Sequence, residues 1–295
     1  MLTNTARVRW SFLVIAAGTA VGAGSNVALA DIVGVSTDKT KYGHVMNLGN
    51  RCAPTATANS FAYLQNSYPN IFKDDNRIVR DAAGAPTNDV TKLRDALCDG
   101  WGDKVGPRAG TGANGANLKQ WWEGKVTWLD QYAPGKVEYS AMMFNEPNAG
   151  TWIRGSKVTS AYPTWDYLWD AINHGCDVEL NVINLGFTNA HALTLTGLQY
   201  DDADDNGSRD PGEDIAMSFI DPNDPNDANA NNIQPRALTI NAAQGNRFEF
   251  TWWQDGGGWY IDSALVECAV PAPSVVIVLG AAGIGALGGR RRRSA

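Results

Sequence analysis

The order of apolar and polar positions divides this chain into a helical first part and a strand-rich second part. Apolar residues recur at helical spacing after Cys52, over residues 90–97 and 118–131, and again after Thr164, which can cap a helix. From residue 177 onward apolar positions alternate with polar ones, as is typical of strands. The pattern therefore predicts helices first and a sheet afterwards.

The predicted strands are short and are separated by turn residues. One weakly alternating segment, 137–144, lies among the predicted helices. The others follow one another along the chain over residues 177–183, 191–200, 215–220, 238–241, 247–253 and 259–266. A helical half followed by an antiparallel sheet is an α+β domain, which is the fold class that we predict.

Two of these strands flank the turn-rich segment 201–214 and so predict an antiparallel hairpin. If Tyr200 pairs near the end of that segment, Leu193 lies opposite Asp221, and the open end of the hairpin brings Asp221 next to His191. A carboxylate beside an imidazole fixes its tautomer and raises its basicity. The alternatives are a core histidine and an aspartate that only ends a strand.

A cysteine begins the first predicted helix. Pro54 follows near the first helical position, where a missing N–H has no cost, and Tyr68-Pro69-Asn70 ends the helix. A thiol at a helix N-terminus lies near the positive end of the helix dipole and near free N–H groups, and both favour the thiolate. Cys52 is therefore a candidate nucleophile. The alternatives are a buried structural cysteine and one half of a disulfide.

Three short blocks of sequence resemble the papain-like cysteine peptidases of the C39-like type. They are Cys52-x-Pro54-Thr55-Ala56 on a helix, the strand that begins Asn189-Ala190-His191, and Ile220-Asp221-Pro222, in this order. The resemblance covers roughly residues 45–265 and implies a papain-like fold, in which a helical half packs on a C-terminal antiparallel sheet. It also implies that Cys52 is the nucleophile, His191 the base and then the acid, and Asp221 the orienting group.

The chain departs from that family at two positions. The family usually has Gly after the catalytic Cys, where this chain has Ala53. It also expects a Gln about six positions before the nucleophile, where this chain has Met46. Asn47 is the nearest residue with an amide donor, and Asn50 is the next. We expect Asn47 to stabilise the oxyanion together with the Cys52 N–H. The substitution matters for activity, because loss of one oxyanion donor slows the reaction by about 10²–10³.

Both ends of the chain carry targeting patterns. Residues 1–30 combine two arginines, an apolar run and Ala28-Leu29-Ala30, which predicts a signal peptide that signal peptidase removes on export. Pro271-Ala272-Pro273 precedes a second apolar run and four arginines. This tail resembles the PEP-CTERM sorting signal of Gram-negative bacteria, with Ala272 in place of the usual Glu.

That resemblance implies a transient association of residues 269–295 with the inner membrane. It further implies cleavage by an exosortase-type processing enzyme and a final location in the cell envelope or outside the cell. The alternative is a plain C-terminal anchor, for which the apolar run is short. The folded domain would then span residues 31–268.

Charge and cysteine content narrow the possible partners. The formal net charge is −7, and removal of both end segments takes away six arginines and no acid, which leaves −13. A protein this acidic is not expected to bind nucleic acid or an anionic membrane surface. Four cysteines in an exported chain suggest disulfides. If Cys52 is a nucleophile, Cys98–Cys176 is the bridge that we expect, with Cys268 left over.

The segment between the hairpin strands also fits the D-x-D-x-N-G-x5-E pattern of a calcium-binding loop. Oxygen ligands at alternate positions surround one hard cation, and Gly207 allows the sharp turn. Bound Ca²⁺ would hold the two hairpin strands in register; the alternative is a solvated acidic turn. The expected ligands are Asp202, Asp204, Asn206, Ser208, Asp210 and Glu213.

These features together predict an exported thiol peptidase or a related amide hydrolase, which acts on a peptide or protein substrate through an acyl-enzyme. Two alternatives stay open. One is a catalytically inactive papain-like protein with a secreted binding or extracellular-matrix role. The other is a carbohydrate- or matrix-binding surface built on Trp252, Trp253 and Trp259. His44 and His174 are expected to be structural or surface residues.

Overall fold

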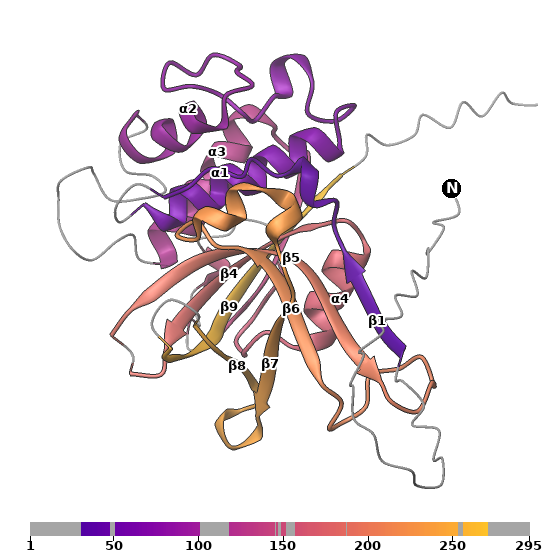
Figure 1. The fold of residues 1–295 in the computed structure, drawn as a ribbon. Coiled ribbons are helices and arrows are strands. Elements are labelled where there is room, and N and C mark those ends of the chain that lie inside the picture. The colour runs from indigo at the N-terminus through magenta and orange to yellow at the C-terminus, as the bar shows by residue number, and fades with distance from the viewer. Residues whose placement is uncertain are drawn as a thin grey trace, which may run out of the picture.

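The protein is a mixture of helices and one large sheet, the α+β class that the sequence predicts. This arrangement comes from a computed structural model, drawn in Figure 1. It describes residues 31–47, 51–100, 118–144, 146, 149–151, 157–186, 188–252 and 256–270.

Within the described residues, four α-helices form where the sequence pattern predicts them. They are α1 (Cys52–Ser67), α2 (Val90–Asp95), α3 (Leu118–Tyr132) and α4 (Trp165–Asn173). The side chains of Asp89 and Thr164 cap α2 and α4 by accepting hydrogen bonds from N–H groups of the first turn. In Figure 1, α1, α2 and α3 lie together on one side of the sheet, and α4 lies close to β1 (Asp31–Ser36).

The strands include all of the predicted segments, together with two that the sequence pattern did not predict, β1 and β3. β1 pairs antiparallel with β5, and β3 pairs in parallel with β2. After β1, the strands are β2 (Val137–Met143), β3 (Lys157–Thr159), β4 (Asp177–Asn184), β5 (Ala190–Asp202), β6 (Ile215–Ile220), β7 (Arg236–Asn241), β8 (Arg247–Thr251) and β9 (Gly258–Ala269).

The sheet closes on itself. β4 pairs with both β5 and β9, and the strands from β5 to β9 each pair with the next, so β4 to β9 form a closed circuit. Val178, Leu180 and Val182 of β4 belong to one buried apolar cluster, which also includes residues of α4. A second apolar cluster gathers α1, α2 and α3 against β2 and the ends of β5 and β6. The helices that carry these clusters therefore cover opposite faces of the sheet.

The expected Cys98–Cys176 disulfide is wrong. Cys176 is bonded to Cys268, with their Cα atoms 4.4 Å apart. The strand pairing explains this choice, because Asp177 at the start of β4 lies opposite Glu267 near the end of β9. The two cysteines are the next residues outward on the same pair of strands, and the bond joins the strand ends. Cys98 is buried among the helices instead.

A fully buried charged cluster joins the helices to the sheet. Lys125 of α3 places its Nζ 2.5 Å from Glu267, 2.8 Å from Glu179 and 3.5 Å from Asp177. The same ammonium donates to the Ser60 hydroxyl of α1 at 2.9 Å, and that hydroxyl in turn donates to Asp177. We call these five residues the Lys125 cluster. All three carboxylates are inaccessible to solvent.

Candidate active site

Cys52 is the first residue of α1 and is half-buried. The helix behind it is buried from Ala53 to Gln65 and packs along β5. The Thr194 hydroxyl of β5 donates to the Ala56 carbonyl at 3.3 Å, which ties the first turn of α1 to that strand. The free Cys52 thiol therefore lies at a well-anchored helix N-terminus, where the helix dipole favours an anion.

His191 and Asp221 meet at the open end of the β5–β6 hairpin. Thr194 pairs with Ile220, the last residue of β6, so Asp221 follows directly and lies beside the beginning of β5. His191 Nε2 is 2.8 Å from Asp221 Oδ1, and the two side chains are 7% and 0% exposed. The structure thus brings together the imidazole and the carboxylate that the hairpin register predicts as neighbours.

The hydrogen bond to Asp221 determines which nitrogen of His191 can serve Cys52. A carboxylate accepts, so Nε2 carries a proton and donates to Asp221. In the neutral ring Nδ1 is then the basic nitrogen, and it is the one left to face the thiol, with which His191 is hydrogen-bonded. This is the arrangement that a nucleophile and its general base require.

The charges of Cys52 and His191 support each other. Burial alone would raise the pKa of the Cys52 thiol, but the hydrogen bond and the positive charge of His191 lower that pKa below its ordinary value. The N–H groups of Ala192 and Ala53 act in the same direction. Burial would also lower the pKa of His191, but its bonds to Asp221 and Cys52 raise that pKa to about 9. Both directions favour a thiolate–imidazolium pair.

Neighbouring groups hold the imidazole and the carboxylate in place. Asp221 Oδ1 also accepts from the Asn223 N–H at 2.8 Å, and the Asp221 N–H donates to Asp227 Oδ2 at 2.8 Å. The ring of Trp252 packs edge-on against the His191 ring, with ring centroids 5.1 Å apart. The hydrogen bond between His191 and Asp221 is therefore shielded from water on several sides.

Asn47 lies beside Asp221 and is held by three hydrogen bonds. Its N–H donates to the Pro222 carbonyl at 2.8 Å, and its side-chain carbonyl accepts from the Arg51 N–H at 2.9 Å. Its amide nitrogen donates to Asn223 Oδ1 at 2.7 Å, which leaves the second amide hydrogen for a ligand. Asn50, the other expected donor, lies outside the described residues.

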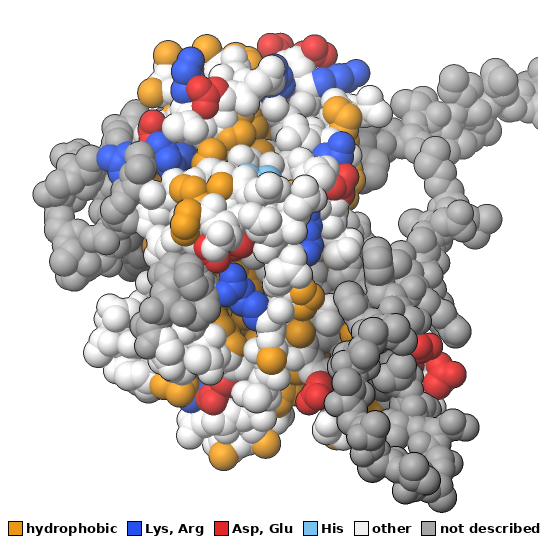
Figure 2. All heavy atoms as spheres, viewed as in Figure 1, with side chains coloured by type: hydrophobic (Ala, Val, Ile, Leu, Met, Phe, Trp, Pro, Cys, Tyr) orange, Lys and Arg blue, Asp and Glu red, His pale blue; other side chains and the backbone are white. Residues whose placement is uncertain are grey.

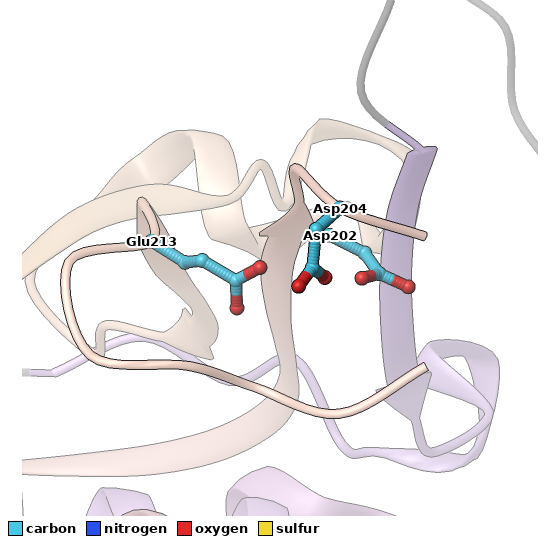
Figure 3. A group of neighbouring side chains, drawn as sticks. All are labelled: Asp202, Asp204 and Glu213. Atoms are coloured by element: carbon cyan, nitrogen blue, oxygen red, sulfur yellow. The ribbon is translucent and has the colours of Figure 1, made fainter. Parts of the chain in front are cut away.

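The predicted calcium ligands gather at the tip of the β5–β6 hairpin. One carboxylate oxygen from each of Asp202, Asp204 and Glu213 lies within 4.8 Å of the others. Figure 3 shows the Glu213 carboxylate pointing across the loop toward the two aspartates. Oxygen atoms grouped in this way suit a hard divalent cation.

The other three predicted ligands stabilise the same loop. Asn206 Nδ2 donates to Asp204 at 3.0 Å and to Asp210 at 2.6 Å. The Ser208 N–H donates to Asn206 Oδ1 at 2.7 Å. Gly207 has a φ of 75°, the left-handed conformation that the sharp turn requires.

The remaining histidines and tryptophans have structural surroundings. The His44 ring lies between two backbone carbonyls, and His174 follows α4, where its Nδ1 donates to the Asp170 carbonyl at 2.7 Å. Trp252 and Trp259 are buried and pack against each other, with ring centroids 4.7 Å apart. They therefore do not form an exposed binding platform, and Trp253 lies outside the described residues.

Sequence reasoning missed two buried charged groups, Asp227 and the Lys125 cluster. Asp227 had a visible signal, since the segment 221–227 reads D-P-N-D-P-N-D and places an acid at every third residue. The members of the Lys125 cluster come from four separate elements, and nothing in their local sequence distinguishes them from surface charges.

No protein-family model matches this chain, and no curated protein is detectably similar to it. In the part of the chain that the structure describes, no helix has both the length and the apolar character needed to cross a membrane. The predicted signal peptide lies outside those residues, and so does the predicted sorting tail from Pro271 onward.

Proposed function

We propose that this protein is a thiol peptidase or a related amide hydrolase with a papain-like fold of the C39-like type. One observation carries the proposal: a half-buried thiol at a helix N-terminus contacts an imidazole whose other nitrogen is 2.8 Å from a buried carboxylate. These three groups match the nucleophile, the general base and the orienting carboxylate of covalent acyl transfer.

The proposed reaction has two stages. The Cys52 thiolate attacks a substrate carbonyl, and the His191 imidazolium protonates the leaving amine, which forms an acyl-enzyme. Water then attacks the acyl group while His191 takes its proton and Asp221 holds the ring; the thioester bond breaks, the carboxylic acid product leaves, and the Cys52 thiolate and His191 imidazolium are restored. The developing oxyanion would accept hydrogen bonds from the Cys52 N–H and from the remaining amide hydrogen of Asn47. The Cys52 N–H is available because N–H groups of the first helical turn have no partner within the helix.

The decisive experiment is alkylation of the purified protein with iodoacetamide between pH 5 and 9, followed by mass mapping. Rapid labelling of Cys52 with a depressed apparent pKa, lost in His191→Ala, is the expected result. Cys98 is a second thiol outside the disulfide and serves as an internal reference for slow labelling. If Cys52 reacts no faster than a model thiol, the proposal fails, and the inactive binding or matrix role takes its place.

We further propose that the protein is exported and processed at both ends, by signal peptidase and by an exosortase-type enzyme. The Cys176–Cys268 disulfide agrees with an oxidising compartment. Figure 2 shows Lys and Arg side chains scattered among acidic and apolar ones on the face viewed there. Binding of nucleic acid relies on clustered basic groups, so the partner that we propose is a peptide. Intact mass of protein recovered from a Gram-negative host tests the processing, which predicts a chain that starts at Asp31.

We also propose that the loop of residues 202–213 binds Ca²⁺ as a structural ion. The supporting features are the complete ligand pattern and the three grouped carboxylates. Because this loop joins the strands that carry His191 and Asp221, the ion would strengthen the hairpin on which the candidate active site depends.

A further inference from the structure

The turn that follows β6 contains three buried acids at every third residue. Asp221, Asp224 and Asp227 are 0%, 3% and 1% exposed. Asp227 folds back on the start of this turn, and its Oδ2 accepts the backbone N–H of Asp221 at 2.8 Å. A second hydrogen bond closes the turn, from the Asp224 N–H to the Asp221 carbonyl at 3.0 Å. The Asp227 carboxylate thus holds the Asp221 backbone in place through this N–H.

We propose that Asp227 is a positioning residue of the candidate active site, whose carboxylate fixes Asp221 and places a second buried negative charge behind the His191–Asp221 pair. This inference rests on the proposed thiol-hydrolase function. The contacts run in one order: Asp227 binds Asp221, Asp221 binds His191, and His191 contacts Cys52. Along this path Asp227 is separated from the imidazole by one residue and from the thiol by two, so its negative charge acts mainly on the imidazolium and stabilises the ion pair.

Charged groups from several elements face Asp227. Asp221 and Asp224 carry the same charge, and Asp224 is paired with Arg236 of β7 at 3.2 Å. Lys39 donates to a backbone carbonyl nearby, and its positive charge acts on Asp227. The His44 ring donates through Nδ1 to the Asp227 carbonyl at 2.8 Å. Acids and bases together surround the carboxylate, so its ionisation depends on a balance among them.

Because of that balance, the Asp227 carboxylate gains a proton under mildly acidic conditions. Burial, followed by the charges of Asp224 and Asp221, raises the pKa of Asp227 to about 6, against the lowering effect of the Asp221 N–H and Arg236. Above pH 6 the carboxylate is ionised and supports the His191 imidazolium. Below pH 6 it is neutral, and the thiolate–imidazolium pair loses part of its stabilisation.

A matched pair of variants tests this role. In Asp227→Asn the amide oxygen can still accept the Asp221 N–H, so the substitution removes the charge and keeps the hydrogen bond. In Asp224→Asn a charge is removed from the same turn, while Asp227 keeps its contact with Asp221. The rate of Cys52 alkylation is measured from pH 4.5 to 8 for wild type and both variants, with thermal melts to establish that each is folded.

We expect the wild-type profile to show a second inflection near pH 6. Asp227→Asn should lose that inflection and raise the apparent pKa of Cys52 by roughly half a unit to one unit, less than the effect of a charge in direct contact because Asp227 acts through Asp221 and His191. Asp224→Asn should keep the inflection and move it to lower pH, because removal of a like charge lowers the pKa of Asp227.

The outcomes separate this inference from the function on which it rests. A wild-type Cys52 without a depressed pKa overturns the thiol-hydrolase proposal. A depressed wild-type pKa with an Asp227→Asn profile that superimposes on it overturns the role of Asp227 alone. If Asp227→Asn does not fold, NMR of the His191 ring in Cys52→Ser decides the matter. A titration step near pH 6 that moves in Asp224→Asn supports the role, and its absence refutes it.

Discussion

The candidate active site and the Lys125 cluster are both buried arrangements of charge, and they differ in balance and in access. In the candidate site one imidazole lies between one thiol and one carboxylate, and the thiol is half-buried. In the Lys125 cluster three carboxylates share one ammonium, and every charged group is inaccessible. The first arrangement can present a reactive group to a substrate, whereas the second is sealed between α1, α3 and the sheet.

In both places the compensation of buried charge decides which groups keep their protons. A buried charge is tolerated when an opposite charge compensates for lost hydration. The Lys125 cluster meets this condition only in part, because Asp177 Oδ1 and Glu267 Oε1 lack hydrogen-bond partners among the described residues. Burial therefore keeps the pKa of Glu179 and Glu267 above the ordinary range. Burial alone would lower the pKa of Lys125, but the charges of the three carboxylates raise that pKa above its ordinary value. The two glutamates therefore keep their protons to higher pH than exposed glutamates do, and Lys125 keeps its positive charge.

The largest effect is expected from Lys125→Met, which removes the ammonium and leaves three acids buried together. Breaking a buried ion pair by removal of one partner costs about 3–5 kcal/mol. Urea unfolding at pH 7 measures the change, and the exposed Lys119→Met on the same helix is the control. A loss below about 1 kcal/mol, the size of a surface pair, would show that the cluster does not hold the helices on the sheet.

The next effect is a fall in stability with rising pH. Burial raises the pKa of Glu179 from 4.5 to about 7, against the lowering effect of Lys125. The folded state therefore binds more protons than the unfolded state between these values, and its stability decreases as pH rises from 4.5 through 7. The contribution is of the order of 2–3 kcal/mol. Unfolding free energies at pH 5 and pH 8 should differ in this direction, and the difference should shrink in Glu179→Gln.

Asp221→Ala should affect the reactive thiol more than the fold. It leaves the His191 Nε2 proton without its charged acceptor, a hydrogen bond worth about 1.5–3 kcal/mol. The stabilisation of the imidazolium falls by that amount, so Cys52 alkylation at pH 6.5 should slow by roughly 10- to 100-fold. Unchanged alkylation, with the fold verified by circular dichroism, would remove Asp221 from the site. Asp262→Ala, a buried aspartate of β9 outside the site, is the control.

Removal of calcium is expected to have the smallest effect. A structural ion at the hairpin tip would stabilise the protein by about 1–3 kcal/mol at Ca²⁺ concentrations well above its Kd. Thermal melts with added Ca²⁺ and with EGTA should therefore differ by several degrees. The difference should vanish in Glu213→Gln, which removes one of the three grouped carboxylates. Identical melts in both conditions would leave the loop a solvated acidic turn.

Much of the fold and half of the candidate site could be predicted from local patterns. The four helices have regular apolar spacing and, at α2 and α4, capping residues. The hairpin register follows from the alternation of residues in two strands joined by one turn, and it places Asp221 beside His191. β1 and β3 were not predicted, because β1 pairs with a strand far away along the chain and β3 has only three residues.

The sequence by itself determined what depends on neighbours along the chain: the Cys52 helix, the strand alternation, the hairpin and the acidic loop. Only the tertiary structure decided that Cys52 meets His191, that Cys176 bonds to Cys268 and that Lys125 collects three acids. The physical reason is that local backbone preferences repeat with the period of a helix or a strand. Contacts between distant elements depend instead on how whole faces pack, and many sequences of similar pattern allow different pairings.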